Sequence, residues 1–250
     1  MEWLKTQKWF ELDTGVFESA CMGDQLEALK WLRSEGCPWN ERARVESAGS
    51  GHLEILKWLR TLDPPCPWGA YACRNAAGHG HLETLKWLRS EGCPWDEETC
   101  ARAALGGHLE ILRWLRSKGC PWDERTCMGA ARNGHLETLR WLRSEGCPWN
   151  ERACTRAALG GHLEMLKWLR SKGCPWNESV CAGAAYGGHL GTLKWLRSEG
   201  CPWDEETCTW AAKKGHLDVL EWAIKNGCPY EVTNQWTKPA RDLLESLRRS

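Results

Sequence analysis

The chain has 250 residues, and its 33 Lys and Arg are balanced by 33 Asp and Glu, so the formal net charge is zero. This balance excludes a protein whose main task is to coat nucleic acid or an anionic membrane, and a hydrophobic content of 42% excludes a disordered chain. The composition is unusual in its 19 Trp and 15 Cys beside only 2 Phe and 3 Tyr. Such a bias predicts one short pattern that is copied many times.

The sequence predicts neither a signal peptide nor a membrane span. Residues 1–10 hold no apolar run of signal-peptide length, and no stretch approaches the roughly 18 apolar residues that would cross a bilayer. An odd number of cysteines also cannot pair completely within one chain. We therefore expect a cytoplasmic or nuclear protein with mostly reduced thiols and no membrane insertion.

A tandem repeat organises most of the chain. The phrase Gly-His-Leu-Glu, or a close variant, recurs every 27 residues from His81 onward, and 29 residues separate His52 from His81. A degenerate copy precedes these. The pattern predicts an N-terminal extension or cap at 1–9, eight repeats over 10–227, and a C-terminal capping helix region at 228–250.

The repeat at 93–119 illustrates the helices that we expect in each copy. Asp96 is placed to cap a first helix over 97–105, and a second helix over 108–118 is ended by Gly119. The apolar residues of the second helix cover an arc of roughly 220°; they are Leu109, Ile111, Leu112, Trp114 and Leu115. Neither helix can bury so broad a surface alone, so the repeats must stack on one another.

Residues 99–119 resemble the ankyrin repeat, whose pattern runs Thr-Pro-Leu-His, two alanines, then Gly-His-Leu-Glu and a leucine-rich segment to Gly. Ala103 and Ala104 match the paired alanines. The repeat has 27 residues instead of about 33, and the missing six lie between Asp96 and Glu97, where the family carries its β-hairpin tip. Short Cys-Pro-Trp versions resemble repeat proteins of algae, other protists and giant viruses. The resemblance implies an all-α ankyrin-like solenoid of about eight helix-turn-helix repeats, with short loops in place of β-hairpins.

The first helices differ among the repeats at four positions that share one side, which we call the first-helix face. In ankyrin-like proteins this side lines the groove where partners lie. We expect it to bind a partner through Arg102, Leu105, Arg125, Met128, Arg132, Arg152, Arg156, Leu159, Tyr186, Trp210 and Lys213. Gly129 and Gly183 on the same face suggest that space is needed there. The alternative is that exposed positions drift without a function.

Tryptophan, cysteine and histidine each recur in columns, at fixed positions of the repeat. Two Trp columns, which hold 15 of the 19, are interpreted as packing between repeats, and the alternative is a stacking ladder for single-stranded nucleic acid. Two Cys columns lie seven residues apart within the repeat, and column mates are about 8–10 Å apart, which argues against zinc and disulfides and for small buried hydrophobic residues. We expect the histidines to form local hydrogen bonds.

No catalytic or cofactor motif stands out, because nearly every candidate residue occurs once in each repeat. We therefore expect a non-enzymatic scaffold, without cofactor or metal, that binds another protein and is monomeric outside that complex. A partner segment that is acidic with apolar anchors would suit Arg102, Arg125, Arg132, Arg152 and Arg156. Two rival hypotheses stay open. One is a nucleic-acid binder that uses the basic ridge of the second helices, and the other is a thiol-based metal or redox protein.

Overall fold

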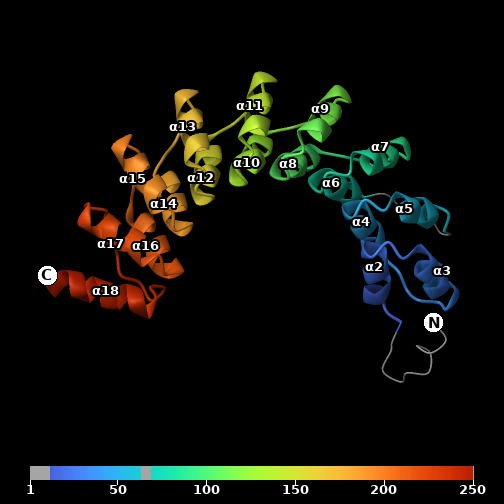
Figure 1. The fold of residues 1–250 in the computed structure, drawn as a ribbon, viewed down its shortest axis with the longest axis horizontal. Coiled ribbons are helices and arrows are strands. Elements are labelled where there is room, and N and C mark those ends of the chain that lie inside the picture. Colours follow the sequence, from blue (N-terminus) through green and yellow to red (C-terminus); the bar gives the residue numbers. More distant parts are fainter. Residues whose placement is uncertain (1–11, 63–68, 250) are drawn as a thin grey trace. The chain divides into compact units, whose positions relative to one another are not determined.

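The computed structural model describes residues 12–62 and 69–249, and within them the regular structure is entirely helical (Figure 1). The extension predicted at 1–9 lies outside the described residues. The chain divides into two compact units, an N-terminal unit Met1–Pro121 and a C-terminal unit Trp122–Ser250. Within the described part, no helix is both long and apolar enough to cross a membrane.

Helix pairs build both units, and in each pair an even-numbered first helix precedes an odd-numbered second helix. The helices of the N-terminal unit are α2 (Thr14–Met22), α3 (Leu26–Ser34), α4 (Arg42–Gly49), α5 (Leu53–Arg60), α6 (Ala70–Gly78), α7 (Leu82–Ser90), α8 (Glu97–Leu105) and α9 (Leu109–Ser117). Those of the C-terminal unit are α10 (Glu124–Arg132), α11 (Leu136–Ser144), α12 (Glu151–Leu159), α13 (Leu163–Ser171), α14 (Ser179–Tyr186), α15 (Leu190–Ser198), α16 (Glu205–Lys214), α17 (Leu217–Lys225) and α18 (Lys238–Arg249). The helices α8 and α9 begin and end within one residue of the predicted bounds.

Polar caps and glycines set the ends of these short helices. The Asn150 side chain accepts a hydrogen bond from the amide of Arg152 at 3.0 Å, and Asp123 caps α10 in the same way. Each supplies an acceptor for an amide that the first turn leaves unpaired. After α13, Gly173 has φ 73°, in the left-handed region that glycine adopts without strain. The local sequence therefore defines where each helix begins and ends.

The first helices of successive repeats pack closely, whereas contacts between successive second helices are sparser. Small residues permit this approach, since Ala157 and Ala158 of α12 and Ala184 and Ala185 of α14 are fully buried. The leucines of the second helices fill the space behind them, as with Leu169, which is also fully buried. Within each unit the hydrophobic core is therefore a continuous layer between the rows of first and second helices.

The Cys-Pro-Trp loops are held by a contact that links one repeat to the next. The Arg143 guanidinium at the end of α11 lies 4.0 Å from the ring centre of Trp149 and donates to the carbonyl of Cys147. On its other side Trp149 meets Trp168 edge to face, with ring centres 5.8 Å apart. The same Arg–Trp contact recurs at Arg89–Trp95, Arg170–Trp176 and Arg197–Trp203. The half-buried tryptophans therefore pack against protein groups. This agrees with the interpretation of the two Trp columns as packing between repeats.

The cysteines approach one another in a way that the spacing argument missed. Each second-column thiol contacts the first-column cysteine of the following repeat, 20 residues later. The thiol of Cys127 donates to the carbonyl oxygen of Cys147 at 3.9 Å. The interaction with the Cys147 side chain, together with burial, raises the pKa of Cys127, so the thiol stays protonated and unreactive. All fourteen cysteines in the described ranges are buried and free of disulfides, and no group of three His, Cys, Asp or Glu there could hold a metal ion.

The histidines also connect repeats, whereas local hydrogen bonds were expected. The His189 ring at the start of α15 lies 3.1 Å from the carbonyl oxygen of Leu159, at the end of the preceding repeat's first helix. A carbonyl only accepts, so Nε2 carries the proton and donates it. The same bond joins His52 to Met22, His81 to Gly49, His108 to Gly78, His162 to Arg132 and His216 to Tyr186.

The helix α18 lies against α17, the last second helix. Ala240 and Leu244 are buried in this contact. The hydroxyl of Thr237 donates to the carbonyl of Ala212 at 2.9 Å, which ties the segment before α18 to the last first helix. These contacts support a capping role for 228–250, which we retain as a proposal.

The burial of His81 makes the N-terminal unit sensitive to acid. Burial of the ring, with a smaller contribution from the neighbouring imidazoles, lowers the pKa of His81 below its ordinary value near 6.5. The unfolded chain therefore binds a proton more readily as the pH falls through 6.5, and the folded state loses stability. In urea unfolding of the full chain between pH 7.5 and 5, we expect His81→Gln to reduce this loss. Equal slopes in both proteins would contradict the account.

Candidate functional site

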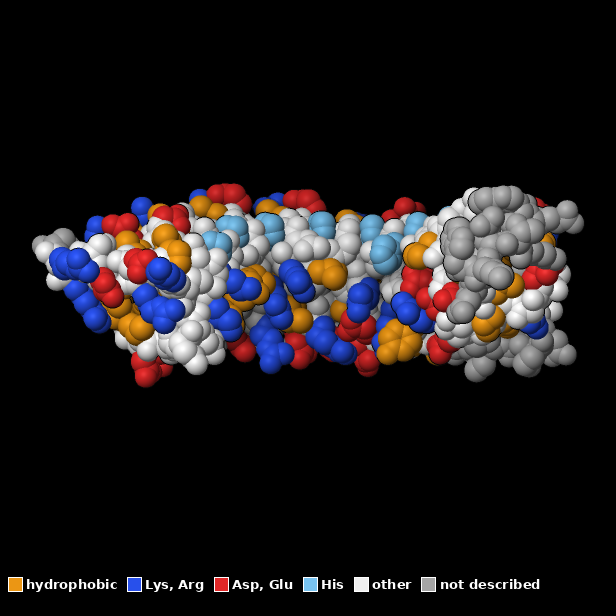
Figure 2. Space-filling view, turned by 90° about the horizontal axis from the view of Figure 1, so that it is seen from below, with side chains coloured by type: hydrophobic (Ala, Val, Ile, Leu, Met, Phe, Trp, Pro, Cys, Tyr) orange, Lys and Arg blue, Asp and Glu red, His pale blue; other side chains and the backbone are white. Residues whose placement is uncertain are grey.

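The first-helix face of the C-terminal unit carries a pocket of about 410 Å³. It is lined by Arg132 of α10, by Thr155, Arg156 and Leu159 of α12, by Ser179, Ala182, Gly183 and Tyr186 of α14, and by Trp210 of α16. Figure 2 shows this side of the unit on the left, where basic side chains lie among apolar ones beside a row of histidines. Five of the predicted binding residues therefore meet at one pocket: Arg132, Arg156, Leu159, Tyr186 and Trp210.

A missing side chain creates the pocket. Arg156, Gly183 and Trp210 occupy the same position in three successive repeats, 27 residues apart. Because Gly183 carries no side chain, the space between its two neighbours stays open. The same glycine also permits close packing of α14 on α12, since a Cβ at this position would lie 2.8 Å from the carbonyl oxygen of Thr155. Gly183 thus serves both the helix contact and the pocket.

Two aromatic rings form one wall. The ring centres of Tyr186 and Trp210 are 5.1 Å apart, and both rings contact lysines that lie outside the pocket lining. The Nζ atom of Lys214 lies 4.3 Å from the Tyr186 ring centre, and that of Lys213 lies 5.0 Å from the Trp210 ring centre. A hydrogen bond with Lys214, together with the charges of Lys214, Lys213 and Arg132, lowers the pKa of Tyr186. The electrostatic potential at this wall is positive.

Two arginines also line the pocket. Neither Arg132 nor Arg156 forms an ion pair or a side-chain hydrogen bond with another residue of the described ranges. None of the nine lining residues is acidic. The hydroxyls of Thr155 and Ser179, which also line the pocket, are already engaged, since they lie 2.9 Å apart and hydrogen-bond to each other. The guanidinium groups are therefore available to an incoming anion.

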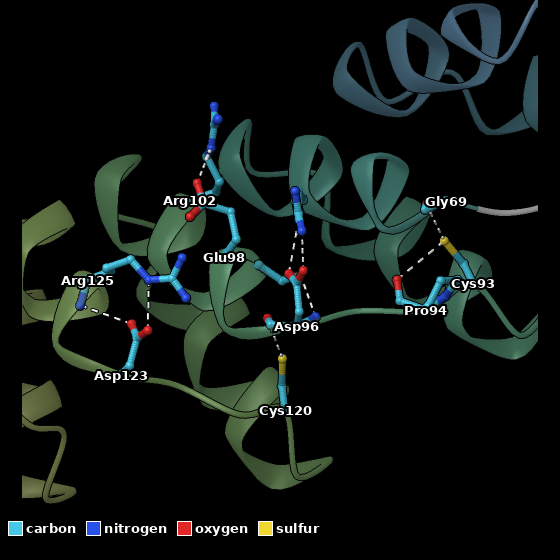
Figure 3. A network of polar contacts seen from close by, with 11 residues as sticks. Gly69, Cys93, Pro94, Asp96, Glu98, Arg102, Cys120, Asp123 and Arg125 are labelled. Atoms are coloured by element: carbon cyan, nitrogen blue, oxygen red, sulfur yellow. Dashed lines mark hydrogen bonds and ion pairs between the residues drawn. The ribbon is translucent and has the colours of Figure 1, made fainter.

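The remaining predicted residues of the C-terminal unit do not line the pocket. Arg125 forms an ion pair with Asp123 at 2.7 Å, close to the start of α10 (Figure 3). Arg152 is exposed on α12, and Met128 is half-buried on α10. Lys213 lies beside the pocket, where it donates to the side chain of Gln235 at 3.0 Å.

In the N-terminal unit the predicted residues are Arg102 and Leu105 of α8. Arg102 forms an ion pair with Glu98 at 2.9 Å, one turn away on the same helix (Figure 3). A local carboxylate thus offsets this arginine, and Leu105 is half-buried. Neither lines one of the described pockets.

Three features near these faces were not predicted. Lys214 lies one residue beyond the varying positions, so the helical pattern does not assign it to the face. Tyr71 is 59% exposed, and its ring lies under the guanidinium of Arg74. Arg74 also forms an ion pair with Asp96, which lowers the pKa of the Asp96 carboxyl. Arg44 is buried at the position where later repeats carry the second-column cysteine, a substitution that aligning all eight repeats would have found.

The second helices carry the basic ridge of the nucleic-acid hypothesis, and much of its charge is locally paired. Glutamates three residues earlier contact the cations at Glu27–Lys30, Glu54–Lys57, Glu83–Lys86, Glu137–Arg140 and Glu164–Lys167. A second pocket of about 350 Å³ lies on this side of the C-terminal unit, lined by Arg140, Arg143, Ser144, Trp149, Trp168 and Lys172. Its Arg143 is already bound to the Cys-Pro-Trp loop, so the pocket offers fewer available cations than its composition suggests.

Comparisons with known proteins agree with this geometry. Residues 127–170, which include α12 and α13, match the family model described as ankyrin repeats (many copies). Residues 127–170 carry ankyrin repeats. The crystal structure of the human ASB11 ankyrin repeat domain shares the fold, with 18% sequence identity and a TM-score of 0.50 over 68% of this chain and 90% of that one. No match was found among curated proteins.

These ankyrin repeats are shorter than the usual 33 residues or so. The described residues contain no strand, so short loops stand where other ankyrin repeats carry β-hairpins. The Cys-Pro-Trp loop supplies the link between repeats through its Arg–Trp contact. Any partner of the described ankyrin repeats must therefore bind helices or these loops.

The double role of Gly183 leads to a stability prediction. We expect Gly183→Ala to destabilise the protein by roughly 1–3 kcal/mol, because the new Cβ meets the backbone of the neighbouring ankyrin repeat. The matched control is Gly191→Ala in α15, where a Cβ has no neighbour within 4 Å. This control should raise stability by up to about 1 kcal/mol, since alanine favours helices. Urea unfolding checks both, and equal effects would contradict the close approach.

Proposed function

We propose that this ankyrin-repeat chain is a protein-interaction scaffold whose C-terminal unit binds an extended segment of another protein along its first-helix face. The segment carries acidic residues and at least one apolar anchor. The pocket around Gly183 supports this proposal most directly, because it combines an apolar and aromatic wall with two arginines that form no ion pair with any described residue. Arginine and large aromatic residues are the types that dominate binding energy at protein interfaces.

The contacts favour this function over its two rivals. A nucleic-acid binder would need exposed aromatic faces, yet Trp149 is half-buried and its ring is covered by Arg143 and Trp168. A thiol-based metal or redox protein would need accessible thiols, yet all fourteen cysteines of the described residues are buried. Burial also raises the pKa of Cys21 to about 11. We also propose that the protein is not an enzyme. Its compartment is a reducing one, the cytoplasm or the nucleus, because its buried thiols are free of disulfides in the described residues.

Charge reversal of the two arginines tests the proposal. The probe is a fluorescent 12-residue peptide rich in glutamate around a central Leu-Phe pair, and its affinity is measured by fluorescence anisotropy. Arg132→Glu with Arg156→Glu should weaken binding at least tenfold, because two attractive charges become repulsive. Peptides with lysine for glutamate, or serine for the Leu-Phe pair, should bind at least tenfold more weakly to the unmodified protein.

The matched control makes the same charge change on the second helices, with Arg140→Glu and Lys167→Glu in α11 and α13. Both control positions are exposed and paired with glutamates of their own helices. The control should bind the peptide within twofold of the unmodified protein, and circular dichroism should show both variants folded. Equal weakening by the two variants would contradict binding at the first-helix face.

A further inference from the structure

We propose that the pocket at Gly183 accepts a phosphotyrosine side chain of the partner. This inference rests on the proposed function and specifies which residue of the bound segment enters the pocket. The other residues of the segment then lie along the neighbouring first helices.

The charge of the pocket exceeds what one carboxylate would neutralise. The side chains of Arg132 and Arg156 form no ion pair or hydrogen bond among the described residues, and Lys213 and Lys214 add positive charge at the aromatic wall. No lining residue is acidic. A phosphate carries a charge of about −1.5 to −2 at neutral pH and has three acceptor oxygens, so one group can engage both guanidiniums. A glutamate has one charge and two oxygens.

The shape of the pocket favours a phosphate that is carried on a ring. A volume of about 410 Å³ lies within the usual range of ligand pockets and is large for a carboxylate alone. The rings of Tyr186 and Trp210, with the side chain of Leu159, provide an apolar surface for an aromatic ring. Aromatic contacts of this kind contribute about 0.5–1.5 kcal/mol beyond the area that they bury. Phosphoserine would leave this surface unused.

Two hydroxyls that line the pocket already have hydrogen-bond partners. The hydroxyl of Ser179 donates to Asn177 at 2.6 Å, and the hydroxyl of Thr155 is engaged with Ser179 and with the carbonyl of Glu151. Both hydroxyls therefore have partners inside the protein. The guanidiniums of Arg132 and Arg156 are the charged donors of the lining for the phosphate oxygens, and Arg matches phosphate geometry through paired hydrogen bonds.

Four nonapeptides test the proposal with the full chain. They share two glutamates on each side of the centre, and the central residue is phosphotyrosine, tyrosine, glutamate or phosphoserine. We expect the phosphotyrosine peptide to bind at least tenfold more tightly than the other three by calorimetry. Its affinity should also fall between pH 7.5 and 5.5, as the phosphate gains its second proton near pH 6.

Neutral variants show where the phosphate binds. Arg132→Gln with Arg156→Gln should abolish the preference for phosphotyrosine, whereas Arg140→Gln with Lys167→Gln should leave it within twofold. Equal binding of the glutamate and phosphotyrosine peptides would overturn the phosphotyrosine assignment and leave the proposed function standing. Equal binding of the phosphoserine peptide would overturn it as well. Failure of all four peptides to bind would overturn the phosphotyrosine assignment, whereas the proposed function falls only if the Leu-Phe peptide also fails to bind.

Discussion

The close approach of first helices from successive repeats is the contact on which the rest of the structure depends. A single helix pair of this length cannot bury its broad apolar surface, so each repeat takes its stability from its neighbours. Buried alanines such as Ala158 and Ala185 make the approach feasible. At Gly183, α14 lies against the backbone of α12, the preceding first helix. The histidine, cysteine and Arg–Trp contacts all join adjacent repeats and hold this spacing.

The binding face follows from the same constraint. Inward positions of the first helices must be small for the helices to pack, whereas outward positions are released from packing and can differ from repeat to repeat. The pocket depends on both effects. Gly183 permits the close helix contact, and it also leaves a space between Arg156 and Trp210. Recognition then needs no loop or hairpin, since the helices supply the floor and the side chains of adjacent repeats supply the walls.

The repeat pattern predicted the helices and the packed Trp columns, and its resemblance to the ankyrin repeat implied the fold, because these depend on patterns within one repeat. It also placed Arg132, Tyr186 and Trp210 on one face. It did not predict that Cys127 contacts Cys147 or that His189 bonds to the preceding repeat. These contacts join different columns across a repeat boundary, so they depend on how the repeats stack. Nor does residue type show which arginines remain available, since Asp123 engages Arg125 while Arg132 has no such neighbour in the described ranges.

The central claim is that the space above Gly183 is a binding pocket for an anion carried on an aromatic ring. A crystal structure of the full chain soaked with phenyl phosphate tests it most directly, because this probe carries both groups and nothing else. The account predicts electron density for the phosphate between Arg132 and Arg156, with the ring against Tyr186 and Trp210. Density for the probe only among the basic residues of the second helices, or an empty pocket at a saturating concentration, would contradict it.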